Sequence, residues 1–329
     1  MNTDAHLIQC GFFQPVLETL RQSGVNTEKL LLKSSLSRFD LDSSENYVPI
    51  NLLYALMLEI SKSQGIDDFY DCFAAEIDVQ NLSDFGEITA FAPDLLSAAH
   101  FAEKNITMLM THGRMRLEID GPICKVSQWY IDAPKPGRDF VDYVDLCYLL
   151  NAFRIAMGAD WTPLEIHLQS QIAPDFDNLF PDVRNIRILL GQPVTAVVVP
   201  TAIMRTPMIG DGSLDSNHLA TDSIPETLSQ VIERILTSSK NAQVANMGLI
   251  ADMLDVSPRT LRRRLSELDT TFFEVVDNWR FKSSLELLED EQAGVNEIAE
   301  RLGYANTPNF DRAFTRWTGT SPSSYRDIK

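Results

Sequence analysis

The last third of the chain contains the same helical pattern twice, and this repeat limits the folds that are open to it. The segment "IADMLDVSPRTLRRRL" begins at Ile250, and "IAERLGYANTPNFDRAF" begins at Ile298, 48 positions later. Each copy reads as a short apolar helix, a turn and a second helix. After the turn the offset between the copies becomes 49, so the second copy has one extra turn residue.

Two apolar residues, four positions apart, anchor the second helix of each copy. They are Leu261 and Leu265 in the first copy, and Phe310 and Phe314 in the second. Residues at this spacing share one face of a helix, so each second helix is predicted to dock on the helix before it. This is the layout of a helix-turn-helix, in which the second helix enters the major groove of DNA.

The opposite face of each second helix carries an arginine. At about 100° per residue, Arg259 and Arg263 point away from the leucine anchors, and Pro308 and Arg312 point away from the phenylalanines. Arginine therefore occupies the same outward position in both copies. Arginine can bind O6 and N7 of guanine with two hydrogen bonds, and Asn309 can bind adenine in the same way.

The predicted DNA-contacting residues lie on these outward faces and their flanks: Arg259, Thr260, Arg262, Arg263, Thr307, Pro308, Asn309, Asp311 and Arg312. Arg264 suits a phosphate contact. Asp311 does not suit one, although it can accept a hydrogen bond from N4 of cytosine. A basic run such as "RTLRRR" is usually a solvated helix face. The recurrence of arginine at matching positions favours base recognition instead.

The net charge of -18 is unfavourable for binding phosphates, but the charge is unevenly divided. Residues 226–329 contain 13 basic and 16 acidic side chains, a net charge of -3. Residues 1–225 contain 15 basic and 30 acidic side chains, a net charge of -15. Local basic patches can therefore decide how the C-terminal part behaves.

A segment of linker composition separates the two parts. "TPMIGDGSLDSNHLATDSIPE", from Thr206 to Glu226, is rich in Gly, Ser, Asp and Pro. We place an effector-binding or dimerisation domain at 1–210, a linker at 211–225 and a DNA-binding domain at 226–329. A length of 329 residues is sufficient for two domains.

The N-terminal part mixes helical and strand periods, which predicts an α+β domain. Apolar residues recur at helical spacing in three segments: 49–61, 67–77 and 140–158. Alternating segments lie at 114–120, 125–131 and 163–171. Gly121 and Pro122 separate the first two, which predicts a hairpin. "VTAVVVPTAIM" is predicted to be a core strand, because it is far too short to cross a bilayer.

Composition argues against an enzyme. The sequence has no familiar catalytic, phosphate-binding or dinucleotide-binding motif. The four cysteines (Cys10, Cys72, Cys124 and Cys147) are scattered, which suits buried thiols better than a zinc site or a disulfide framework. The N-terminus lacks the pattern of a signal peptide. We therefore expect a cytoplasmic protein without catalytic residues, a metal, a cofactor or a membrane contact.

The C-terminal hundred residues resemble the DNA-binding domain of AraC/XylS-type transcription regulators. The residues that match the signature of that family are Ile298, Ala299, Leu302, Gly303, Tyr304, Phe310, Arg312, Ala313, Phe314, Arg316, Trp317, Gly319, Ser321, Pro322, Tyr325 and Arg326. Ala305 stands where serine is frequent. By this resemblance a long helix around Phe272 to Glu289 joins two helix-turn-helix units, which read double-stranded promoter DNA about one helical turn (roughly 34 Å) apart.

The N-terminal part is similar to the α+β effector domain of one branch of these regulators, labelled by analogy with arabinose-binding domains. The similarity rests on "DFGEITAFAPDLLSAAHFAEKN" and "ADWTPLEIHLQSQIAPDFDNLF". It implies an unidentified small-molecule effector, a homodimer and contact with RNA polymerase. A domain that binds another protein or dimerises without sensing a metabolite stays open. The methyl-accepting DNA repair proteins share this DNA-binding module, but they need a cysteine cluster that this sequence lacks.

Overall fold

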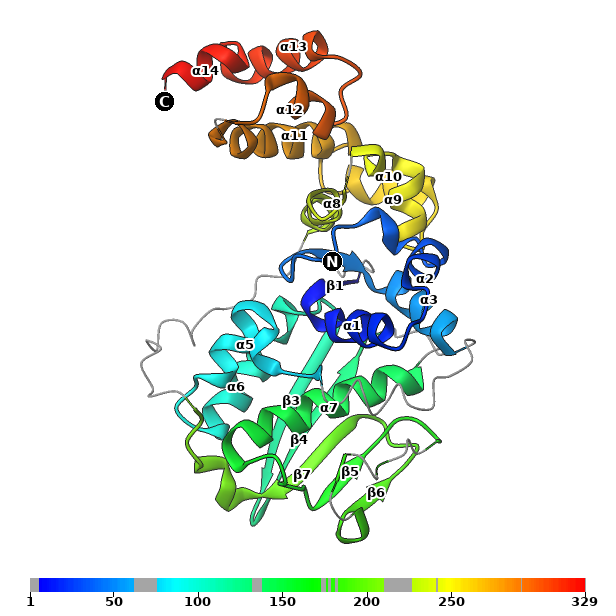
Figure 1. Ribbon diagram of the computed structural model, residues 1–329, viewed down its shortest axis with the longest axis vertical. Helices are drawn as coiled ribbons and strands as arrows, with labels where there is room; N and C mark the ends of the chain where they lie inside the picture. Colours follow the sequence, from blue (N-terminus) through cyan, green and yellow to red (C-terminus); the bar gives the residue numbers. More distant parts are fainter. Residues whose placement is uncertain are drawn as a thin grey trace. The chain divides into compact units, whose positions relative to one another are not determined.

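The computed structural model describes residues 6–61, 76–131, 138–172, 176, 179–180, 183–209, 227–240, 242–290 and 292–328 (Figure 1). The predicted linker at 211–225 lies outside the described residues, as does nearly all of the predicted helix at 67–77. The contacts divide the chain into two compact units, one mainly N-terminal and one mainly C-terminal. Within the described ranges, no helix is both long enough and apolar enough to cross a membrane.

The N-terminal unit is built on a five-stranded sheet in the order β3-β4-β7-β5-β6. The strands are β3 (Gly113–Asp120), β4 (Ile123–Tyr130), β5 (Glu165–His167), β6 (Arg187–Leu189) and β7 (Thr195–Pro200). Only β5 and β6 are parallel; the other neighbours are antiparallel. β3 and β4 form the predicted hairpin, whose turn contains Gly121 in the left-handed conformation at φ 56°.

The central strand of this sheet is the predicted apolar core strand. Ala196, Val197 and Val199 of β7 are fully buried. The long helix α7 (Arg138–Met157) packs against β7 and crosses the sheet in Figure 1. The predicted strand at 163–171 is shorter than expected, because the backbone N–H of Ser170 turns to donate to Oδ2 of Asp142 at 2.7 Å.

The remaining elements of this unit surround the sheet. A small antiparallel pair is formed by β1 (Leu7–Gln9) and β2 (Tyr47–Pro49). The helices are α1 (Gln14–Gln22), α2 (Thr27–Lys33), α3 (Ile50–Ser61), α5 (Ser83–Ala90) and α6 (Leu95–Asn105). The 3₁₀ turns are η1 (Cys10–Phe12), η2 (Leu36–Arg38), η3 (Val79–Asn81), η4 (Ile106–Met108), η5 (Val183–Asn185) and η6 (Thr201–Arg205). The mixed α/β class predicted for this part is confirmed.

The C-terminal unit is helical, as predicted. Its helices are α8 (Leu228–Thr237), η8 (Ala242–Val244), α9 (Met247–Met253), α10 (Pro258–Ser266), α11 (Phe272–Glu289), α12 (Val295–Arg301), α13 (Thr307–Thr318) and α14 (Pro322–Ile328). The short segment Arg38–Asp40 also belongs to this unit. Its Phe39 is fully buried, and the N–H of Asp40 donates to the carbonyl of Ser238 at 2.9 Å.

Two copies of one helix-turn-helix are present in this unit, α9 with α10 and α12 with α13. The first helix of each motif ends with the same hydrogen bond. The N–H of Val256 donates to the carbonyl of Ala251, and 48 positions later the N–H of Tyr304 donates to the carbonyl of Ala299. The turn residue before each N–H is left-handed: Asp255 at φ 52° and Gly303 at φ 75°. Four residues then separate α9 from α10, and five separate α12 from α13. The extra turn residue is confirmed.

Candidate nucleic-acid interface

The second helix of the first motif, α10, has the two faces that its sequence predicts. Ser257 caps its N-terminus by accepting the N–H of Thr260 at 3.1 Å, and Pro258 occupies the first turn. Leu261 and Leu265 are fully buried. The helix also carries four arginines that are exposed or half-buried: Arg259, Arg262, Arg263 and Arg264.

The second motif repeats this construction in α13 with different residues. Asn306 caps the helix by accepting the N–H of Asn309 at 3.0 Å. Phe310 and Phe314 are fully buried, while Pro308 and Arg312 are exposed. The remaining predicted contacts of this motif, Thr307, Asn309 and Asp311, are half-buried.

The two outward arginines have different partners on their own helices. Nη1 of Arg263 lies 2.5 Å from Oε1 of Glu267, one turn later, in an exposed ion pair. Nη2 of Arg312 donates to Oδ1 of Asn309, one turn earlier. The predicted base-contacting pair on α13 is therefore already joined, with the amide oxygen of Asn309 as the acceptor and its NH₂ group as a remaining donor.

A carboxylate on α11 orients α13, and the sequence reading did not single it out. Asp277 accepts hydrogen bonds from Arg316 at 2.6 and 2.8 Å and from the indole N–H of Trp317 at 2.9 Å. Charge-assisted bonds of this kind fix direction as well as distance. Arg316 and Trp317 therefore hold α13 in place. In the sequence, the only signal for these two residues is that they match the family signature.

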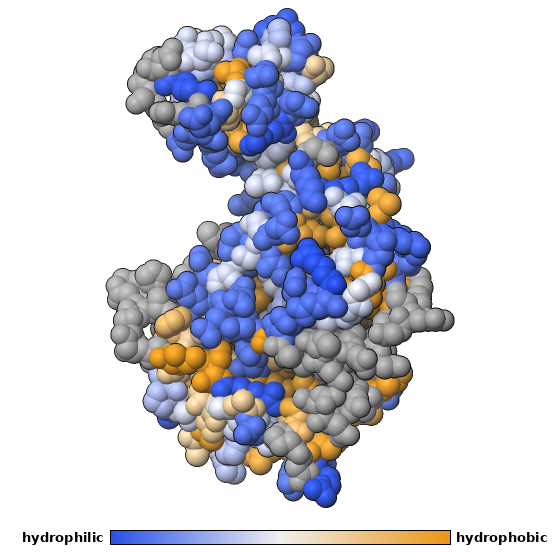
Figure 2. All heavy atoms as spheres, in the orientation of Figure 1, coloured by the Kyte–Doolittle hydropathy of each residue, from blue (hydrophilic) through white to orange (hydrophobic). Residues whose placement is uncertain are grey.

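Two further signature residues, Gly303 and Arg326, are also structural. The guanidinium of Arg326 donates to the carbonyls of Leu288 and Ala293, at 3.3 and 2.8 Å. A Cβ on Gly303 would lie 2.6 Å from the Cβ of Ala242. Arg326 therefore holds α14 against α11 and the loop after it, and Gly303 permits the close approach of the second turn to Ala242. The face of this unit seen in Figure 2 is mainly hydrophilic, with scattered apolar residues.

Comparison with known proteins agrees with this geometry. Residues 250–328 match a protein family described as "Helix-turn-helix domain". The chain is 38% identical over 109 residues to the ornithine utilization regulator of Pseudomonas aeruginosa, which is 33% of this chain and 32% of that protein. It is 30% identical over 139 residues to the transcriptional regulator VirS of Mycobacterium tuberculosis, 42% of this chain and 38% of that protein.

The C-terminal part is thus a DNA-binding helix-turn-helix domain of the kind found in transcription regulators. More narrowly, its signature residues resemble those of AraC/XylS-type regulators, and its matches to the two regulators agree with that resemblance. The chain spans about a third of the length of these relatives. Among solved structures, the regulator CdpR of Pseudomonas aeruginosa aligns with 96% of this chain and 98% of its own, at 18% identity and a TM-score of 0.47.

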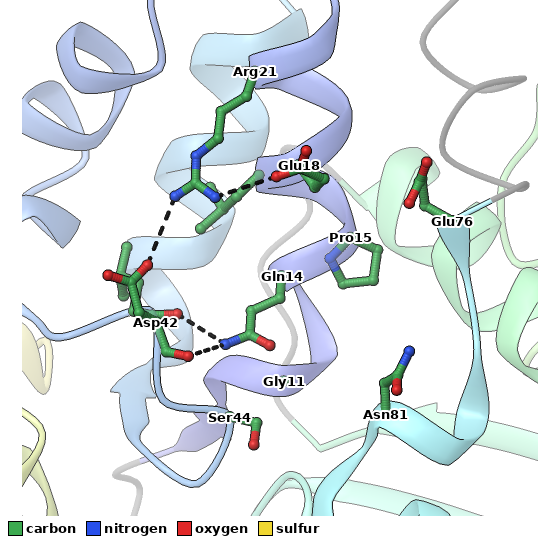
Figure 3. Close-up of a pocket in the computed structure, with 11 residues that line it drawn as sticks. Gly11, Gln14, Pro15, Glu18, Arg21, Asp42, Ser44, Glu76 and Asn81 are labelled. Carbon is green, nitrogen blue, oxygen red and sulfur yellow. Dashed lines mark hydrogen bonds and ion pairs between the residues drawn. The ribbon is translucent and has the colours of Figure 1, made fainter.

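The N-terminal unit contains an open pocket of about 470 Å³ (Figure 3). Helix α1 forms one wall with Gln14 and Glu18, and Glu76 and Asn81 face it from the other side. Gly11 lies at the base, where an added Cβ would come within 3.2 Å of Ser44 and 3.4 Å of the backbone of Asn81. A side chain at this position would therefore reduce the space.

The charges in this pocket are mostly negative. Among the described residues that line it, Glu18, Asp42 and Glu76 are acidic and Arg21 is basic. The guanidinium of Arg21 lies 3.4 Å from Glu18 and 3.8 Å from Asp42, so it is already balanced. Gln14 uses its NH₂ group to donate to the carbonyls of Leu41 and Asp42, both at 3.0 Å, which leaves its amide oxygen as an acceptor. Sequence reasoning proposed no ligand-contacting residues, because pocket walls and ordinary core look alike in a sequence, and the lining residues are dispersed between Gly11 and Asn81.

Proposed function

We propose that the chain is a sequence-specific transcription regulator that inserts α10 and α13 into successive segments of the major groove. The observation that carries the proposal is the repeated arginine: Arg263 and Arg312 are both exposed at corresponding positions of two helices whose opposite faces are fully buried. Direct reading of guanine by each arginine is the chemistry that these positions suit best.

The remaining predicted contacts divide between bases and phosphates. On α10, Arg259, Thr260 and Arg262 flank Arg263, so this helix supplies most of the positive charge. On α13, Arg316 is bonded to Asp277, and Arg312 lies beside the acidic Asp311, so contacts there depend more on hydrogen bonds. We infer that α10 contributes more to the salt-dependent part of the affinity than α13 does.

DNA binding is tested with the full-length protein and the DNA upstream of the genes beside its own. Fluorescence anisotropy titrations at several salt concentrations should show tighter binding to one of these fragments than to DNA of scrambled sequence. The affinity for both should fall steeply as salt rises, because counterions are released from the phosphates. Equal affinity for every fragment at every salt concentration would contradict the proposal.

We further propose that the pocket of Figure 3 holds the small-molecule effector, and that the effector is an organic cation with a primary ammonium group. The carboxylates of Glu18 and Glu76 and the amide oxygen of Gln14 are all hydrogen-bond acceptors at its walls. An ammonium group offers three donors and the opposite charge. The name of one relative, the ornithine utilization regulator, refers to a compound that carries such a group, but that name describes the relative alone.

Thermal unfolding with a panel of diamines, and with matched neutral diols and dicarboxylates, tests the effector class. Diamines should raise the melting temperature, since a ligand that binds the folded state stabilises it. Glu76→Gln should remove most of that rise, whereas Glu59→Gln, a carboxylate paired with Lys33 elsewhere in the unit, should not. If no compound of the panel stabilises the protein, the alternative of a domain that only binds other proteins gains support.

A further inference from the structure

The first strand of the large sheet, β3, lies at the edge of that sheet and pairs only with β4 among the described strands. It is eight residues long, as long as its partner. An unpaired edge of this length presents a row of free N–H and C=O groups to another strand. Ile119 on this edge is 52% exposed, which is high for so large an apolar side chain.

The direction of the free backbone groups follows from one hydrogen bond. The N–H of Leu117 donates to Oε1 of Glu103 on α6 at 3.3 Å, so it points away from β4. Because outward and inward groups alternate along an antiparallel strand, Met115 and Ile119 also present their N–H and C=O groups to the open edge. Glu103 occupies one of these donors and has to release it before another strand can pair.

The sequence of this edge is self-complementary. "RMRLEID", from Arg114 to Asp120, has two arginines before Leu117 and two acidic residues after it, at equal distances. When two copies of β3 pair antiparallel about Leu117, Arg116 lies opposite Glu118 of the other copy. Arg114 then lies opposite Asp120, and opposite charges at facing positions stabilise a sheet.

Neighbouring symmetric registers lack this match. If the two-fold axis passes through Arg116, the arginines of the two copies lie opposite each other. If it passes through Glu118, the two carboxylates lie opposite each other. Like charges at facing positions are destabilising. In the register about Leu117 the apolar residues also match, since Met115 lies opposite Ile119 of the other copy and Leu117 lies opposite Leu117 of the other copy. These apolar residues share one face of the strand and the charged residues share the other.

We propose that a second copy of this chain binds at the β3 edge, joining the two sheets into one through a two-fold axis at Leu117. Such a contact uses the same surface on both copies and closes after two. The inference rests on the proposed function and extends it, because a dimer would place the DNA-binding units of two copies on one operator. It identifies the surface that brings the two copies together.

The test is sedimentation of the full-length protein over a range of concentrations, without DNA. The wild type should form dimers. Arg116→Glu and Glu118→Arg should each weaken dimerisation at least tenfold, because each places like charges opposite each other twice. The double variant Arg116→Glu with Glu118→Arg restores both pairs, and its dissociation constant should return to within about threefold of that of the wild type.

Arg187→Glu is the matched control. Arg187 lies on the other edge strand, β6, and is exposed and paired with a carboxylate, Glu165, at 3.0 Å. This variant should dimerise like the wild type. Melting temperatures identify any variant that is simply misfolded, and Leu117→Cys provides an independent readout, because mild oxidation should link its two copies through residue 117.

Three results would overturn the inference: a wild type that stays monomeric, single variants that dimerise normally, or a double variant that is not rescued. Binding of a single half-site by each variant reports on DNA recognition separately. A monomer that still binds its half-site would remove the proposed dimer surface and leave the proposed regulator intact. Loss of sequence preference in the wild type would remove the regulator itself.

Discussion

Arg312 donates a hydrogen bond to the side-chain oxygen of Asn309, whereas the corresponding Arg263 forms an ion pair with Glu267. The two outward arginines therefore give the exposed faces of α10 and α13 different local net charges. The pair on α13 keeps its positive charge, because an amide is neutral. The pair on α10 is locally neutral, because the carboxylate of Glu267 balances the guanidinium of Arg263.

The ion pair on α10 predicts that Glu267→Gln will tighten binding to DNA of any sequence. Removing the carboxylate frees Arg263 and removes a negative charge from the approaching surface. The slope of affinity against salt should increase by about one phosphate contact. Titration of scrambled DNA at several salt concentrations measures both effects.

Glu297→Gln provides the control for that experiment. Glu297 forms the same kind of pair, four residues before Arg301 at 2.6 Å, but on α12, the first helix of its motif. Its replacement should change affinity less than that of Glu267. Equal effects from the two variants would mean that Arg263 does not lie closer to DNA than Arg301 does.

Asp277→Ala should destabilise the C-terminal unit and disorient α13. The carboxylate accepts bonds from Arg316 and Trp317, so its removal leaves the indole N–H without its acceptor. We expect the free energy of unfolding to fall by about 1–3 kcal/mol, the usual cost of losing such bonds. Urea unfolding measures this loss. An unchanged midpoint together with unchanged specific binding would show that the contact does not position the helix.

Alanine variants of the two left-handed turn residues, Asp255 and Gly303, should lose stability by different amounts. Asp255→Ala should cost about 1 kcal/mol, because alanine at positive φ is strained. Gly303→Ala should cost more than Asp255→Ala, because the new Cβ would also meet the Cβ of Ala242 at 2.6 Å. Thermal unfolding of both variants gives the comparison. If the two losses are equal, the close approach at Gly303 is relieved by a small shift of the backbone.

The buried His112 predicts that the protein loses stability as the pH falls. Burial, and then the charges of His6 and Arg114, lower the pKa of His112 to about 3. Its ring stacks between His6 and Tyr130, with centroids 4.9 Å away on both sides. The unfolded chain takes up a proton near pH 6.5 and the folded chain does not, so this contribution to stability is complete above pH 6.5 and decreases below it.

At pH 5 this loss amounts to about 2 kcal/mol. His112→Phe keeps an aromatic ring in the stack and should make the decrease in unfolding free energy between pH 7 and pH 5 shallower. His100→Gln is the control, since His100 is exposed on α6. A pH profile that His112→Phe leaves unchanged would contradict the assignment.

The sequence was most informative where one short pattern identifies both the buried and the exposed face of a helix. Leu261, Leu265, Phe310 and Phe314 could be assigned to the core from their spacing, and the repeat then placed Arg263 and Arg312 on the outer faces. The hairpin of β3 and β4 was predictable for a similar reason. Alternation and a turn glycine are local signals, and they need no knowledge of distant residues.

Contacts between distant residues could not be predicted in this way. Asp277 lies 39 and 40 positions from its partners, and nothing in the helix around it distinguishes this carboxylate from a solvated one. The pocket of Figure 3 brings Gly11 and Asn81 together, and this contact follows from the tertiary fold, which helical or strand periodicity does not predict. The strand at 163–171 was predicted too long, because the contact of Ser170 with Asp142 on α7 ends it early.

The most direct test of the two-helix reading is selection of bound DNA from a random pool by the full-length wild type, Arg263→Ala and Arg312→Ala. The wild type should select two clusters of preferred bases about 10 base pairs apart. Arg263→Ala should lose preference in one cluster and Arg312→Ala in the other, each at a cost of about 1–3 kcal/mol on the wild-type site. If both variants select the same sequences as the wild type and bind all DNA more weakly by the same factor, the two arginines contact phosphates alone, and the account is wrong.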